Sequence, residues 1–71
     1  MIKKIIVQGI NSRDGASEVE DVLYSLMGVV TVNIDDDLKT AVVDAQEDIP
    51  DKEIKAMLKD AGYDALSIQN A

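Results

Sequence analysis

Two segments with apolar residues at helical spacing alternate with four short runs rich in β-branched residues, and this order most constrains the fold. Such runs are typical of strands, because β-branched side chains pack well on a pleated surface. In the second run, alternation predicts that Val30, Val32 and Ile34 share one face. The four runs span residues 2–7, 29–34, 40–45 and 65–68.

The segment between the first and second runs is predicted to form a helix. Asn11, Ser12 or Asp14 can cap its start, because short polar side chains accept hydrogen bonds from free backbone N–H groups there. Gly28 stands where a glycine commonly follows a helix end. The apolar stripe consists of Ala16, Val19, Leu23 and Leu26, flanked by Val22 and Met27.

A second helix is expected between the third and fourth runs. Asp51 and Glu53 lie in its first turn, where the helix dipole favours negative charge. Gly62 follows its end, in the position of a terminating glycine. Its apolar stripe consists of Ile54, Met57, Leu58 and Ala61.

The resulting order is β-α-β-β-α-β within a single domain over residues 1–71. Short connections and right-handed crossovers leave one compact arrangement for two βα units joined by an antiparallel hairpin. We therefore predict an α+β, ferredoxin-like sandwich, in which a four-stranded antiparallel sheet carries two helices on one face. Because this fold hosts many functions, it does not by itself identify one.

Cysteine and histidine are both absent from the 71 residues. Their absence excludes disulfides, thiolate and imidazole metal ligands, cysteine nucleophiles and Ser-His-Asp triads. Phenylalanine and tryptophan are also absent, although 46% of the residues are hydrophobic. The core is therefore expected to be aliphatic.

Fourteen acidic residues against seven basic ones give a formal net charge of −7. This charge disfavours binding to nucleic acid and to anionic membrane surfaces. No apolar run approaches the roughly 18 residues that a membrane span needs. We therefore expect a cytoplasmic protein without membrane insertion and without a nucleic-acid partner.

Several segments, taken together, resemble one known family. Residues 7–16 read VQGINSRDGA, residues 26–34 read LMGVVTVNI and residues 61–65 read AGYDA. Their order and spacing are similar to those of the heavy-metal-associated (HMA) domain family, which includes small copper chaperones and N-terminal modules of metal-transporting ATPases. The resemblance implies a ferredoxin-like fold and a loop that carries Cu(I) or Zn(II) on the two cysteines of a Gly-Met-x-Cys-x-x-Cys-Ala motif.

The same loop departs from the family pattern. Ser12 and Gly15 stand at the two cysteine positions, and Ile10 replaces the usual methionine. Soft metal ions prefer polarizable thiolates, whereas a serine hydroxyl is hard and neutral and glycine has no side chain. We therefore expect no metal site and no cofactor here. The family alone suggests Cu(I) or Zn(II).

The neighbours of these two positions have other expected roles. Asn11 and Asp14 offer oxygen atoms, but helix capping explains them better than a metal site does. In bacterial members of the family, the tyrosine of the Gly-Tyr pair packs near the metal loop. The resemblance therefore places Tyr63 beside Ser12 and Gly15, where it still serves in packing.

A second resemblance gives an alternative function. Residues 7–13 are also similar to the phosphate cradle of acylphosphatases, V-Q-G-V-x-F-R, and those enzymes share the βαββαβ order. Backbone N–H groups and Arg13 would then hold a phosphoryl group, and Asn33 would orient water. The aromatic residue before the arginine is replaced by Ser12, however, and the HMA motifs fit the chain better.

We therefore predict a non-catalytic HMA-like domain whose thiolate site is lost. Its remaining role would be protein interaction or vestigial metal trafficking, with a metal-transporting ATPase or a related HMA domain as partner. The resemblance implies that the loop and the first helix form the docking surface, as they do in the family. Its acidic residues would favour a basic partner. They are Asp14, Glu18, Glu20 and Asp21.

Overall fold

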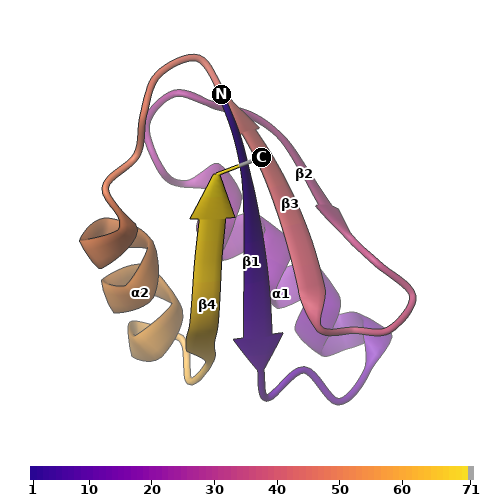
Figure 1. Cartoon of the computed structure of the whole chain (residues 1–71). Coiled ribbons are helices and arrows are strands. Elements are labelled where there is room, and N and C mark those ends of the chain that lie inside the picture. Colours follow the sequence, from indigo (N-terminus) through magenta and orange to yellow (C-terminus); the bar gives the residue numbers. More distant parts are fainter. Residues whose placement is uncertain (71) are drawn as a thin grey trace.

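The computed structural model describes residues 1–70 and has the element order that the sequence predicts (Figure 1). The helices are α1 (Arg13–Tyr24) and α2 (Asp51–Asp60). The strands are β1 (Ile2–Gln8), β2 (Val29–Ile34), β3 (Thr40–Ala45) and β4 (Asp64–Asn70). Within residues 1–70, no helix is long and apolar enough to cross a membrane.

The four strands form one antiparallel sheet in the order β2-β3-β1-β4. The two βα units therefore place β1 and β3 at the centre and β2 and β4 at the edges. Both helices pack on one face of this sheet, and their buried residues join those of the strands in a single core cluster. The ferredoxin-like βαββαβ sandwich is thus confirmed.

The core between the sheet and the helices is aliphatic, as the composition predicts. On β1, Ile5 and Val7 face the helices, and Ile54 and Leu58 of α2 are fully buried against the sheet. Tyr63 is half-buried at the margin of this cluster. The buried cluster consists of Ile5, Val7, Val19, Leu23, Val32, Ala41, Val43, Ala45, Ile49, Ile54 and Leu58.

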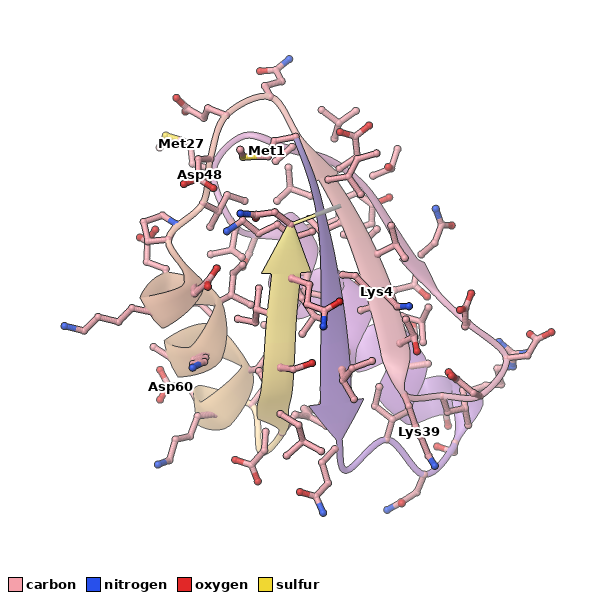
Figure 2. The ribbon with its side chains drawn as sticks, in the orientation of Figure 1. Met1, Lys4, Met27, Lys39, Asp48 and Asp60 are labelled. Carbon is pink, nitrogen blue, oxygen red and sulfur yellow. The ribbon has the colours of Figure 1, made fainter. Side chains whose placement is uncertain are left out.

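The first helix ends earlier than its apolar stripe suggests. Its last residue is Tyr24 and its C-cap is Ser25, so Gly28 is not the residue that terminates it. Gly28 instead lies in the following turn with a φ of 91°. Met27 leaves the helical stripe and is 87% exposed, which corrects its expected place at the flank of the stripe (Figure 2).

The strand alternation predicted for β2 is correct only in part. Val32 is buried and Ile34 is half-buried, but Val30 is 50% exposed. The pairing of β2 with β3 shifts register between Val29 and Thr31. A β-bulge at this point interrupts the two-residue alternation of side chains and turns Val30 away from the core.

The end of α2 agrees with the sequence, whereas β4 is longer than expected. Gly62 has a φ of 95°, and the N–H of Tyr63 donates to the carbonyl of Leu58 at 2.9 Å. This Schellman arrangement fixes the direction in which the chain leaves the helix. The following strand runs to Asn70 because β4 pairs along almost the whole of β1.

Candidate functional site

The loop between β1 and α1 carries the two positions at which the sequence departs from the metal-binding motif. Ser12 is the N-cap of α1, and its hydroxyl accepts a hydrogen bond from the N–H of Gly15 at 3.3 Å. Its carbonyl accepts another from the N–H of Ala16 at 3.0 Å. Of the three capping residues that the sequence allows, the structure selects Ser12. This hydroxyl therefore serves the first turn of the helix.

Replacing the cap is expected to weaken the fold. The Ser12→Ala variant should lose about 1 kcal/mol of unfolding free energy, because the N–H of Gly15 loses its acceptor. Urea denaturation of wild type and variant measures the difference. Ser12→Asp is the matched control and should retain stability, since a carboxylate also caps. Equal stability of the alanine variant and the wild type would contradict the capping role.

Gly15 lies in contact with Tyr63, which extends from the end of α2. A Cβ atom placed on Gly15 would be 3.3 Å from the Tyr63 hydroxyl oxygen. The Tyr63 ring also lies close to Gly9, where a Cβ atom would be 3.4 Å from Cδ1. Gly9 has a φ of 111°, so other residues would be strained there. Tyr63 thus packs against two glycines of the loop, in the region where the resemblance places it.

The Tyr63 hydroxyl also interacts with α1. Hydrogen bonding to the Glu18 carboxylate, and then burial, raise the pKa of Tyr63 above its ordinary value of 10.0. Both effects favour the neutral phenol, because ionisation would place a negative charge beside the Glu18 carboxylate and in surroundings that solvate it less well than water does. The contact therefore stabilises the fold below pH 10, and this contribution is lost as the pH rises through the pKa of folded Tyr63.

A tyrosine titration tests this contact. In a Tyr24→Phe background, Tyr63 is the only tyrosine, and its ultraviolet titration should have a midpoint above 10.0. Adding Glu18→Gln should lower that midpoint, because the carboxylate that opposes ionisation is gone. A midpoint that does not change between these two variants would show that Glu18 has no influence on Tyr63.

Arg13 and Asn33, the two residues that an acylphosphatase activity would require, lie in different surroundings. Arg13 begins α1, and its guanidinium donates to the Asp36 carboxylate at 2.9 Å. Asn33 is exposed on β2, next to the inward-facing Val32, and so belongs to the sheet face away from the helices. The arginine is therefore already paired with a carboxylate.

The oxygen donors of the loop do not form a chelating group that fits a soft metal ion. The Ser12 hydroxyl caps the helix, and Gly15 contributes only a hydrogen atom opposite Tyr63. Asn11 and Asp14 are exposed, with Asp14 in the first turn of α1. Within residues 1–70, no three His, Cys, Asp or Glu side chains group in a way that could hold a metal ion.

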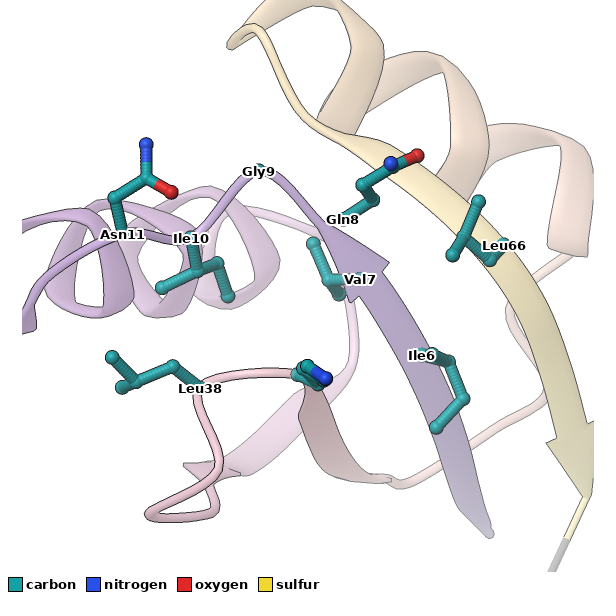
Figure 3. Close-up of a pocket in the computed structure, with 9 residues that line it drawn as sticks. Ile6, Val7, Gln8, Gly9, Ile10, Asn11, Leu38 and Leu66 are labelled. Atoms are coloured by element: carbon teal, nitrogen blue, oxygen red, sulfur yellow. The ribbon is translucent and has the colours of Figure 1, made fainter.

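A shallow groove of about 360 Å³ opens beside this loop (Figure 3). Ile10 and Asn11 form its wall on the loop side, and Leu38 approaches from the β2–β3 turn. Sequence reasoning missed the contribution of Leu38 and Leu66, since neither belongs to a motif or to a helical stripe. The groove is lined by Ile6, Val7, Gln8, Gly9, Ile10, Asn11, Leu38, Lys39 and Leu66.

The comparison with known families decides the assignment. The model of the heavy-metal-associated domain matches residues 4–64, which include most of β1, the loop, both helices and the strands β2 and β3. The chain belongs to the heavy-metal-associated domain family. It is a member without the two cysteines of the metal loop, because the sequence contains none. No curated protein sequence matches it.

Solved structures agree with this HMA assignment. The N-terminal domain of ZntA in its Zn(II) form is 29% identical, with a TM-score of 0.76, covering 96% of this chain and 88% of its own. A copper-binding domain of a P-type ATPase is 26% identical, with a TM-score of 0.81 and coverages of 99% and 96%. Oxidized MerP from Ralstonia metallidurans is 20% identical, with a TM-score of 0.84 and coverages of 99% and 97%, and it supports the fold alone.

Proposed function

We propose that this HMA domain is a non-catalytic interaction module that has kept the family scaffold and lost soft-metal binding. Its partner would be a related HMA domain or a metal-transporting ATPase in the cytoplasm, and neither nucleic acid nor membrane insertion would be involved. The proposal rests on the contacts made by Ser12 and Gly15, the two loop positions at which the family has cysteine. The Ser12 hydroxyl caps α1, and the Tyr63 hydroxyl lies where a side chain at Gly15 would extend.

The docking surface would combine this loop with the exposed face of α1. Asp14, Glu18 and Asp21 follow one another at spacings of four and three residues, so they form one stripe along the helix. All three are exposed, whereas Glu20 is half-buried. An exposed acidic stripe speeds encounter with a basic partner more than it adds to affinity.

A titration of the labelled domain tests the interaction. We expect the N-terminal domain of a metal-transporting P-type ATPase to shift the amide resonances of residues 9–21, without any metal added. The Asp14→Asn/Asp21→Asn variant should bind several-fold more weakly, because the stripe loses two charges. Asp60→Asn on α2 removes an exposed carboxylate elsewhere and should bind as the wild type does (Figure 2). Shifts confined to other surfaces would count against this docking mode.

The enzymatic alternative makes a separate prediction. We expect no hydrolysis of an acyl phosphate above the uncatalysed rate, because Arg13 is paired with Asp36 and Asn33 belongs to the opposite sheet face. Release of inorganic phosphate measures the rate. Hydrolysis that disappears in Arg13→Ala would establish the enzyme and overturn the interaction proposal.

A further inference from the structure

Two leucines line the groove beside the loop, one in a strained backbone conformation and one exposed on a strand. Leu38, in the β2–β3 turn, has a φ of 57°, a conformation that residues other than glycine and asparagine rarely adopt. Leu66, on the edge strand β4, is 61% exposed. Residues held in a strained backbone conformation, as Leu38 is, are concentrated at functional sites.

The backbone directs both side chains to the same place. On β4, Ser67 pairs with Ile6 and Ala65 with Val7, so Leu66 lies at a bulge between them. Bulges of this kind redirect a side chain relative to the regular alternation. The β2–β3 turn is held by the Asp37 carboxylate, which accepts the N–H of Lys39 at 2.8 Å. Both leucines consequently line one groove (Figure 3).

The rest of the groove lining combines apolar residues, two neutral polar residues and one cation. Ile6 and Ile10 are half-buried residues of its lining, which also includes the neutral polar residues Gln8 and Asn11. Of the groove residues in the described chain, only Lys39 is charged. This single positive charge, on a chain with a net charge of −7, can pair with one carboxylate of a ligand.

We propose that this groove binds a short extended segment of a partner protein, with a large apolar side chain as anchor and one neighbouring carboxylate. The anchor would lie between Leu38 and Leu66, and the carboxylate would pair with Lys39. A second copy of the chain is a poorer occupant, because two molecules that each carry −7 repel one another. This surface shares Gly9, Ile10 and Asn11 with the loop of the proposed docking surface, but it does not include the acidic stripe of α1.

Selection from a random peptide library displayed on phage, against the full chain, tests the proposal. Enriched peptides are expected to share a large apolar residue next to Asp or Glu. A synthetic copy of the enriched peptide should shift the amide resonances of Leu38, Lys39 and Leu66. No enrichment, or a consensus of basic residues, would overturn the proposal. A dimer in sedimentation experiments whose interface covers the groove would also overturn it.

Variants of the two leucines make the test specific. Leu66→Ser and Leu38→Gly should each weaken peptide binding about fivefold or more, as expected for anchor contacts. Leu38→Gly suits the positive φ and Leu66 is exposed, so neither change should unfold the domain. Val30→Ser, at another exposed aliphatic residue on β2, is the matched control and should bind normally. Unchanged binding in both leucine variants would place the peptide elsewhere and refute the assignment.

The two proposals fail independently. The leucine variants leave α1 and the loop intact, so their binding to the ATPase domain should equal that of the wild type. If the ATPase domain does not bind but the peptides do, only the proposed function is wrong. If the ATPase domain binds through α1 and no peptide is enriched, only the groove is misassigned.

Discussion

The Ser12→Cys/Gly15→Cys variant is expected to take Cu(I) from a strong chelator, whereas the wild-type domain is not. The two positions lie at the start of α1, and the Ser12 side chain already accepts a hydrogen bond from the N–H of Gly15 in the first turn. A thiolate placed there is stabilised by the helix N-terminus, so a larger fraction is ionised and able to bind metal. Two such thiolates form a soft donor pair that serine and glycine cannot replace.

Tyr63 limits how completely the site can be restored. A Cβ atom on Gly15 would contact the Tyr63 hydroxyl at 3.3 Å, so the tyrosine must move by a few tenths of an ångström. Adding Tyr63→Phe removes that hydroxyl and should increase the affinity of the double variant further. Each single cysteine variant should compete much more weakly than the pair. A folded double variant that leaves the chelator fully loaded would show that the scaffold has lost more than its two sulfurs.

The Asp48→Asn/Asp51→Asn variant is expected to lower the free energy of unfolding by about 2 kcal/mol. The Lys3 side chain is only 7% exposed, and its ammonium contacts Asp51 at 2.7 Å and Asp48 at 3.2 Å. Removing both partners leaves a charge that is largely removed from water without compensation, which costs about 3–5 kcal/mol at fully buried sites. The two carboxylates are about half exposed, so water reduces the effect.

Thermal denaturation near neutral pH measures this effect. The melting temperature should fall by roughly 8–16 °C, as about 2 kcal/mol implies for a domain of this size. Adding Lys3→Met should restore most of the loss, because methionine packs without needing a carboxylate. Asp60→Asn is again the exposed control and should melt as the wild type does. If the double variant is as stable as the wild type, Lys3 does not depend on these partners.

The same ion pairs predict how stability varies at alkaline pH. Hydrogen bonding to Asp51 is the main influence that raises the pKa of Lys3 above 10.5, and it outweighs the opposing effect of burial. A raised lysine pKa stabilises the fold fully below pH 10.5 and ceases to do so as the pH passes the pKa of the folded state. On the alkaline side, the contribution of the charged Lys3 should therefore be constant from neutrality up to pH 10.5 and be lost as the pH rises further.

Sequence reasoning was most successful where the cause of structure is local. The order of elements, a polar cap from among Asn11, Ser12 and Asp14, and the terminating Gly62 all follow from residue types within a few positions of one another. It was less successful at the end of α1 and at Val30. There, a turn held to the β3–α2 connection through Gly28 and a bulge against β3 override the apolar periodicity. Neither the turn nor the bulge can be predicted from a short stretch of sequence, because each depends on contacts with a distant segment.

At the candidate site, too, the features that depend on residue type could be predicted from the sequence, and the contacts between distant residues could not. The replacement of the thiolates by Ser12 and Gly15 can be read directly from the chain, because the chemistry of a donor belongs to its residue type. Alternation along β1 places Lys3 on the same face as Ile5 and Val7, but its partners lie 45 and 48 positions away. Only the packed structure brings α2 and its preceding linker to that lysine.

The sequence by itself thus determined the family, the strand and helix order and the loss of the sulfur ligands, since these depend on local pattern and side-chain chemistry. The tertiary structure alone decided which groups meet. It placed the Tyr63 hydroxyl at Gly15 and brought Leu38 and Leu66 into one groove. Those contacts join segments that are distant in the chain. They form only when the sheet and the helices pack together, so local sequence patterns do not predict them.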